Sequence, residues 1–404
     1  MTFKVKLLLI GVFLFSIGCV TDLDKKAEQI HNDIISIDTH TDTPLNFLDK
    51  DFDIGKRNDF NETRTRVDFP RMKEGRLDAT FMAVFIGQGP RTNEGNIKAK
   101  ERALDIFQAL HEKVILYPEQ AEIALNANDV YNIKASGKST VFIGVENGYP
   151  IGKDLKMVKE FYDLGARYIT LCHTRNNDIC DSSTDSKGPE YNGLSSFGED
   201  VIREMNKLGM IIDVSHISDS AFYDVLELSK APVIASHSSI RAICDNPRNF
   251  SDEMLFAIKE NEGVVQICIL SEYLKTPLPY PERDSAFQVI REKYKHFEGL
   301  TEEEYHQAVK EWRSTEELYP VELATVSDAV DHIDYVVKTI GIDYVGIGTD
   351  FDGGGGIEGC MDVSQMKNIT VELLRRGYNK NEIKKIWGEN FLRVFRSVEQ
   401  IAGI

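Results

Sequence analysis

The sequence has few cysteines and few basic residues for its length of 404. It contains six cysteines and no Cys-x-x-Cys pair, and five remain if Cys19 is set aside, so a disulfide framework is not indicated. Lys and Arg number 47 against 65 Asp and Glu, which gives a net charge of −18. Because phosphate binding needs a basic face, this balance argues against nucleic acid as a partner. The hydrophobic share of 42% is ample for the core of an ordinary globular protein.

The N-terminal apolar run is too short to span a bilayer comfortably. Lys4 and Lys6 precede the run Leu7–Phe15, an arrangement that fits a secretory signal peptide. Ser16-Ile17-Gly18-Cys19 resembles a bacterial lipobox, but Ser16 stands where Leu is usual, so ordinary cleavage and free export stay open. We predict a signal peptide over residues 1–19 and export to the bacterial cell envelope. A lipid anchor on Cys19 would then hold the protein at the membrane.

Eight apolar runs alternate with helical patterns along residues 20–404. Most of these runs are continuous rather than alternating in polarity, as expected for parallel strands that are covered on both faces. The runs are Ile34–Asp38, Ala79–Ile86, Thr140–Glu146, Tyr168–His173, Met210–Ser215, Pro232–Ser236, Gly263–Leu270 and Tyr344–Thr349. Eight strand–helix repeats predict an α/β fold, a single (β/α)8 TIM barrel domain of the metal-dependent hydrolase type.

Helical patterns fall between most of the predicted strands. They cover Ile97–Leu116, Phe197–Leu208, Ala221–Leu228, Asp252–Asn261 and Val326–Ile340, with closing helices within 361–400. Residues 276–320 interrupt the repeat between the seventh and eighth strands. Thr301-x-x-Glu304 reads there as a capping box, which predicts a helical insertion. Whether this insertion is a lid over the barrel mouth or a solvated decoration stays open.

Metal-capable side chains stand at the carboxyl ends of six predicted strands, the end where such barrels place their reactive groups. Four of the nine histidines are among them. The set is His40, Asp42, Glu146, His173, His216, His237 and Asp350. A single histidine at such a place is more often a structural residue. Four histidines with three carboxylates at one end of a barrel make that interpretation improbable and favour a metal site.

The set divides into two metal positions that share one carboxylate. His40 and Asp42 could hold one ion and His216 and His237 a second, with Glu146 as the bridge because a carboxylate has two oxygens. Imidazole and carboxylate ligands without thiolate suit Zn²⁺, although Mn²⁺ or Fe²⁺ could substitute. Asp350 and His173 would then be free to move a proton and to stabilise an oxyanion.

Several longer motifs in this order resemble the membrane (renal-type) dipeptidases, metallopeptidase family M19. They are His40-Thr-Asp42, Gly144-Val-Glu146, Leu164-Gly-Ala-Arg-Tyr-Ile-Thr-Leu-Cys-His173, Asn192-Gly-Leu-Ser-Ser-Phe-Gly198, Asp213-Val-Ser-His216, Pro232-Val-Ile-Ala-Ser-His-Ser-Ser239 and Gly348-Thr-Asp-Phe-Asp-Gly353. The resemblance implies two Zn²⁺ per chain, with His40, Asp42, bridging Glu146, His216 and His237 as ligands. It also implies hydrolysis of dipeptides that have a free C-terminal carboxylate, by a metal-bridged hydroxide.

The resemblance also assigns substrate-contacting roles. His173 would stabilise the oxyanion, Asp350 would carry the proton from the water to the leaving amine, and Arg248 would hold the substrate's carboxylate in a two-pronged ion pair. Together with Glu146, His173 and Asp350 form the expected catalytic group. Two other interpretations stay open, namely another dinuclear amidohydrolase-type hydrolase acting on lactams, lactones or phosphoesters, and a non-catalytic peptide-binding lipoprotein. The assembly state, monomer or homodimer, also stays open.

Three positions depart from the family pattern. Asn147 replaces the Gly that usually follows the bridging Glu, and Cys172 stands where Thr is usual before His173. The predicted seventh strand, Val265-Gln-Ile-Cys-Ile-Leu270, lacks the typical Asn-Phe-Tyr. These departures leave the expected metal ligands intact and put the side-chain preference in doubt. Since adjacent strand residues point to opposite faces, Cys172 is expected to be a buried structural residue rather than a partner of His173.

Overall fold

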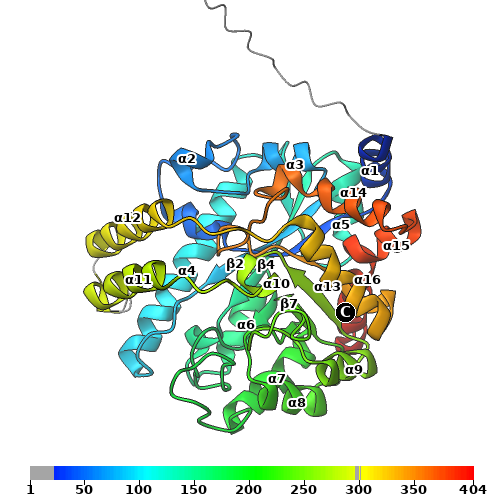
Figure 1. Cartoon of the computed structure of the whole chain (residues 1–404). Helices are drawn as coiled ribbons and strands as arrows, with labels where there is room; N and C mark the ends of the chain where they lie inside the picture. The colour runs from blue at the N-terminus through cyan, green and yellow to red at the C-terminus, as the bar shows by residue number, and fades with distance from the viewer. Residues whose placement is uncertain (1–21, 296–299, 301) are drawn as a thin grey trace, which may run out of the picture.

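The computed structural model describes residues 22–295, 300 and 302–404 of the chain, which form a barrel of eight parallel strands surrounded by helices (Figure 1). The barrel strands are β1 (Ile37–Thr41), β2 (Ala79–Phe85), β4 (Ser139–Glu146), β5 (Ala166–Thr170), β6 (Ile211–Asp213), β7 (Ile234–Ser238), β8 (Val264–Cys268) and β9 (Val345–Gly348). Each pairs with the next in parallel register, from β1–β2 through β8–β9. The predicted (β/α)8 barrel is confirmed.

The barrel closes between its first and last strands. Thr41 and Phe351 form a parallel bridge just beyond the end of β9, and the Asp350 amide donates to the His40 carbonyl at 3.0 Å. Asp42 donates its amide to the Phe351 carbonyl at 2.8 Å. Backbone pairing across this seam therefore fixes three of the predicted site residues next to one another.

All eight predicted strands are present, with ends that shift by a few residues. The largest changes, of three residues, are at β1, which begins at Ile37 rather than Ile34, and at β5, which ends at Thr170 rather than His173. Ser36 is instead held by the Asp78 carboxylate, which accepts from its amide at 2.9 Å and from its hydroxyl at 3.0 Å. A ninth strand, β3 (Ala121–Ile123), pairs with the first three residues of β4. The prediction missed it because three residues are too short for a polarity pattern.

Helices cover the outside of the barrel and its ends. They are α1 (Asp22–Asp33), α2 (Phe60–Thr63), α3 (Phe69–Gly75), α4 (Asn93–Ile115), α5 (Asp129–Ala135), α6 (Lys156–Asp163), α7 (Ser196–Leu208), α8 (Asp219–Leu228), α9 (Asp252–Glu260), α10 (Ser271–Leu274), α11 (Pro281–Lys293), α12 (Glu302–Leu318), α13 (Val326–Thr339), α14 (Lys367–Arg375), α15 (Lys380–Lys384) and α16 (Asn390–Ala402). Side-chain N-caps start several of them, including Ser195 for α7, Ser218 for α8 and Ser251 for α9. The five predicted helices and the closing helices are present.

The insertion predicted at 276–320 contains the helices α11 and α12, which lie side by side at the edge of the barrel (Figure 1). A small cluster of their own holds them together, in which Phe287 packs on Trp312 with ring centroids 4.4 Å apart. Residue 301, the first of the predicted capping box, lies outside the described residues. So do residues 1–19 with Cys19.

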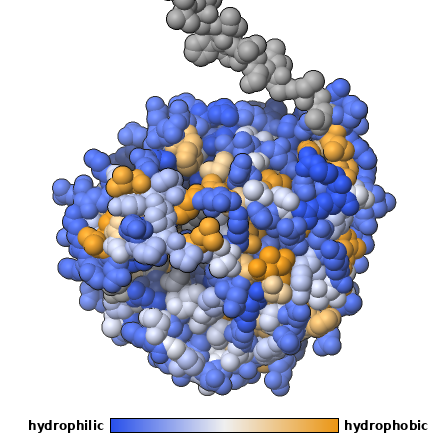
Figure 2. Space-filling model, viewed as in Figure 1, coloured by the Kyte–Doolittle hydropathy of each residue, from blue (hydrophilic) through white to orange (hydrophobic). Residues whose placement is uncertain are grey.

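The visible surface is mostly hydrophilic, and its apolar patches are small and scattered (Figure 2). Within the residues that the structure describes, none of the helices has both the length and the apolar character needed to cross a membrane.

Helix α1 is joined to the rest of the fold through a buried histidine. His31 contacts the Arg76 carbonyl with Nδ1 at 3.2 Å and the Thr370 hydroxyl with Nε2 at 2.7 Å. The Trp387 indole also donates to Thr370 at 2.7 Å, and its ring lies edge-on against His31. Nδ1 must carry the proton, because a carbonyl only accepts. Nε2 then accepts from the Thr370 hydroxyl, so the neutral form of the ring makes both hydrogen bonds. Burial lowers the pKa of His31 to about 4.

We expect the free energy of unfolding to fall in mild acid because of His31. In the unfolded chain its pKa is near 6.5, so below that pH the unfolded state binds a proton that the folded state does not. Between pH 7 and pH 5 this should remove about 2 kcal/mol of the free energy of unfolding. Urea titration at both pH values should show a smaller drop for His31→Gln than for the unaltered protein. An equal drop in both proteins would exclude His31 as the cause.

Candidate metal centre

The seven predicted site residues converge at the carboxyl end of the barrel. His40 and His237 lie within β1 and β7, and Glu146 is the last residue of β4. The other four stand on the segments that follow β1, β5, β6 and β9: Asp42, His173, His216 and Asp350. Two of these four, His216 and Asp350, have left-handed φ angles of 71° and 58°. Such angles are costly for side chains other than glycine and are typical of functional sites.

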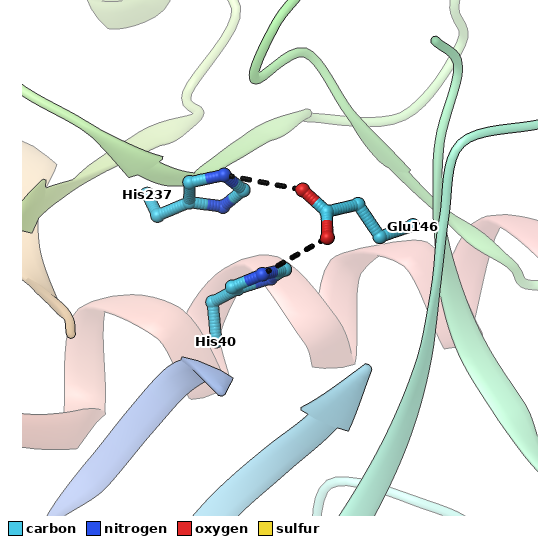
Figure 3. A group of neighbouring side chains, drawn as sticks. All are labelled: His40, Glu146 and His237. Atoms are coloured by element: carbon cyan, nitrogen blue, oxygen red, sulfur yellow. Dashed lines mark ion pairs between the residues drawn. The ribbon is translucent and has the colours of Figure 1, made fainter. Parts of the chain in front are cut away.

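Glu146 lies at the centre of the group with its side chain buried, and its two oxygens face different partners (Figure 3). Oε2 is 3.4 Å from His40 Nε2. Oε1 is 3.1 Å from His216 Nε2 and 3.5 Å from His237 Nε2. One oxygen of the carboxylate thus faces one imidazole and the other faces two, an arrangement that a shared ligand requires.

Two further carboxylates complete the His40 side. Asp42 Oδ2 is 3.8 Å from His40 Nε2, and ligand atoms of His40, Asp42 and Asp350 all lie within 4.8 Å of one another. Burial, and then the charge of Glu146, raise the pKa of Asp42. Burial, and then the charge of Asp42, raise the pKa of Asp350 well above its usual range. This closeness of Asp350 to Asp42 and His40, which belong to the first predicted metal position, was not predicted from the sequence.

The donor set fits metal ions. Among the described residues, His40 Nε2 and Asp42 Oδ1 are buried atoms without a hydrogen-bond partner. His216 Nε2 and His237 Nε2 face each other at 2.9 Å beside Glu146. Burial holds the pKa of both rings well below the usual value, so they are neutral, the form in which imidazole binds metal. Imidazole nitrogens and carboxylate oxygens that converge without thiolate suit Zn²⁺.

His173 stands at the rim of the group. Its Nε2 is 3.8 Å from Glu146 Oε1, and its side chain is 22% exposed. Phe85 packs edge-on against its ring with centroids 4.8 Å apart. A cavity of about 1200 Å³ opens beside it, lined by the segments that follow β2 and β5. His173 is the residue through which this cavity borders the group.

Arg248 brings a buried positive charge next to the group. One guanidinium nitrogen donates to the His237 carbonyl at 3.0 Å, and another lies 3.4 Å from the Ser238 hydroxyl. Nε has no hydrogen-bond partner within the described part of the chain. The Tyr273 ring lies 5.3 Å from the guanidinium carbon. Tyr273 comes from α10, just beyond the β8 sequence that departs from the family pattern.

The other two departures have structural explanations. Asn147 has a φ of 76°, a conformation that Gly and Asn tolerate best, and its side chain donates to the Ile86 carbonyl at 2.8 Å. Cys172 is buried, with Sγ 3.8 Å from the carbonyls of Asp181 and His216. A structural role for Cys172 is consistent with these contacts.

Sequence reasoning missed the residues that support the ligands. The Tyr168 hydroxyl lies 2.8 Å from His40 Nδ1. A Cβ atom at Gly144 would overlap the Tyr168 ring, so the glycine of the Gly144-Val-Glu146 motif makes room for this tyrosine. Tyr168 lies inside an apolar run, so its sequence context does not mark it as a site residue.

A parallel barrel with this donor set at its carboxyl end defines a metal-dependent hydrolase. The family model described as membrane dipeptidase (peptidase family M19) matches residues 24–403. Dipeptidase tcpJ of Claviceps purpurea is 33% identical over 83% of this chain and 70% of its own length. Dipeptidase 3 of Mus musculus is 32% identical over 94% of this chain and 67% of its own length.

A solved structure agrees with these relatives. The probable dipeptidase PvdM from Pseudomonas aeruginosa superposes with a TM-score of 0.82 at 30% identity, covering 94% of this chain and 99% of that one. The chain belongs to the membrane dipeptidase family, peptidase family M19, and is a metallopeptidase of the dipeptidase type. The predicted family is confirmed.

Gly353 provides a test of how tightly the carboxylates are placed. A Cβ atom there would overlap Oδ2 of Asp42 and Oδ1 of Asp350. Gly353→Ala should therefore displace both carboxylates and weaken Zn²⁺ binding by about tenfold or more, measured by competition with a chelator. Gly87→Ala is the matched control, because a Cβ atom at Gly87 meets open space. Equal Zn²⁺ affinity in both variants would show that Asp42 does not hold the metal.

Proposed function

We propose that this protein is a dinuclear zinc dipeptidase that hydrolyses dipeptides with a free C-terminal carboxylate. The observation that carries the proposal is the placement of Glu146, with one oxygen facing His40 and the other facing His216 and His237. Glu146 would be shared by the two ions, His40 and Asp42 would hold one of them, and His216 and His237 would hold the other. When bound, two such ions would acidify a water and polarise the scissile carbonyl.

The remaining site residues would position the substrate and move the proton. Burial lowers the pKa of His173 to about 3, so near neutral pH its ring can donate a hydrogen bond to an oxyanion without being charged. Asp350 has a raised pKa because of burial and the nearby Asp42 charge, which suits a group that accepts a proton from water and returns it to the leaving amine. His173 faces the cavity, and Asp350 lies on the His40 side.

Arg248 would set the length of the substrate. Its guanidinium is buried beside His237, so a substrate carboxylate that pairs with it lies close to the ligand group. In a tripeptide cleaved at its first bond, an amide would occupy that place and leave the guanidinium unpaired. An unpaired buried charge is costly, so the site would favour dipeptides. The family and the relatives named as dipeptidases support this assignment.

Metal content tests the shared carboxylate. Elemental analysis of the active protein should find two Zn²⁺ per chain, and Glu146→Gln should lose both, because an amide cannot offer two anionic oxygens. Glu94→Gln, at an exposed surface pair with Lys98, is the control and should retain both ions. At most one ion in the active protein, or an unchanged metal content in Glu146→Gln, would contradict the dinuclear arrangement.

A dipeptide and its C-terminal amide test the role of Arg248. The unaltered protein should show a kcat/KM for the free acid that is higher by on the order of 10²-fold, since the amide leaves the buried guanidinium unpaired. Arg248→Ala should lose most activity on the acid and little on the amide. Arg203→Ala, at an exposed position on α7, should behave like the unaltered protein. Equal cleavage of acid and amide by the unaltered protein would remove Arg248 as a carboxylate clamp.

A further inference from the structure

A chain of short hydrogen bonds runs from a buried carboxylate to the ring of His237. Asp213 Oδ2 lies 2.6 Å from the Ser236 hydroxyl, which in turn lies 2.8 Å from His237 Nδ1. All three residues are buried. We infer that Asp213 and Ser236 are positioning residues that fix the tautomer of His237 and aim the lone pair of its Nε2 at the metal position.

The direction of each hydrogen bond follows from the donors around Asp213. Its Oδ1 accepts from the amides of Ser215 at 3.0 Å and Ser236 at 2.8 Å, and its Oδ2 accepts from the hydroxyls of Thr170 at 2.5 Å and Ser236. A carboxylate only accepts, so the hydrogen of the Ser236 hydroxyl points to Asp213. The Ser236 oxygen can then only accept from His237. The proton of the neutral ring therefore sits on Nδ1.

The lone pair of His237 consequently lies on Nε2. That atom is 3.5 Å from Glu146 Oε1 and 2.9 Å from His216 Nε2, so it points into the ligand group. Histidine ligands commonly donate their second ring N–H to a carboxylate or carbonyl, which orients the ring and raises its basicity. Here a serine hydroxyl stands between the ring and the carboxylate. His40 is held differently, since its Nδ1 meets the Tyr168 hydroxyl.

Thr170 supplies a matched control for this relay. Its hydroxyl donates to the same oxygen of Asp213 as Ser236 does, and it is equally buried. It makes no hydrogen bond to His237 itself, because its hydroxyl donates to the carboxylate. Thr170→Val therefore perturbs the buried polar cluster without removing the group that accepts from the imidazole. Ser236→Thr keeps the hydroxyl and tests for rescue.

The first measurement does not depend on metal or on activity. The metal-free full-length protein, labelled with ¹⁵N-histidine, is studied by long-range ¹H–¹⁵N correlation, with His237→Gln to assign the signals. His237 should be the Nδ1–H tautomer in the unaltered protein, in Thr170→Val and in Ser236→Thr. Ser236→Ala should give a mixture of tautomers. An Nε2–H tautomer in the unaltered protein, or an unchanged spectrum in Ser236→Ala, would overturn the inference.

The second measurement rests on the proposed function, because it takes His237 as a zinc ligand. Chelator competition should show that Ser236→Ala binds one of the two Zn²⁺ ions about 10–100-fold more weakly, with affinity restored in Ser236→Thr and retained in Thr170→Val. Equal losses in Ser236→Ala and Thr170→Val would overturn the relay in favour of a general packing role. If the unaltered protein binds no Zn²⁺, the proposed metal function fails, whereas the tautomer result is decided by the first measurement.

Discussion

Closure of the barrel between β1 and β9 is the constraint on which the site depends. Asp38 spans this seam from inside, where its carboxylate accepts from the Thr349 amide at 2.8 Å and from the Thr349 hydroxyl at 2.6 Å. It also accepts from the His40 amide at 3.3 Å. Burial raises the pKa of Asp38 to about 6, so these donors are needed to keep a carboxylate there. Asp38 and Thr349, which are 311 positions apart in the sequence, are thereby held next to each other. His40 and Asp350 lie one or two residues further along the chain, so they are brought together as well.

A second buried carboxylate performs the same task across β5, β6 and β7. Asp213 gathers donors from each of these strands or the residues that follow them, just as Asp38 does at the seam. Buried polar groups are tolerated only when their hydrogen bonds are complete, and a complete network leaves one arrangement of the chain. Asp38 and Asp213 therefore fix the backbone at the ends of the strands that carry the site. The imidazoles on these strand ends are held in fixed positions as a result, which is what preorganisation of a metal site requires.

The sequence predicted the position of the site far better than its internal contacts. Strand ends could be read from apolar runs, and parallel strands in a barrel bring their carboxyl ends to one face, so convergence of the seven residues followed. The approach of Asp350 to Asp42 could not be read in this way, because it depends on register across the closing seam. Tyr168 and Ser236 were missed because they lie inside apolar runs. The sequence there does not show which residue a hydroxyl will contact in the folded barrel. The insertion was predicted as helical from its capping pattern, but its relation to the cavity depends on packing rather than on local sequence.

Charge explains why the buried site is suited to cations and to an anionic substrate. Glu146, Asp42 and Asp350 place three buried carboxylates in one group, with the positive charge of Arg248 nearby. Their mutual repulsion is visible in the raised pKa values of Asp42 and Asp350, for which burial is the first cause and a neighbouring carboxylate the second. In the proposed enzyme, two divalent cations would more than offset this excess. The site would then attract a negatively charged group, and Arg248 marks the side on which a substrate carboxylate can enter. The same buried charges would thus hold the metal and select the substrate.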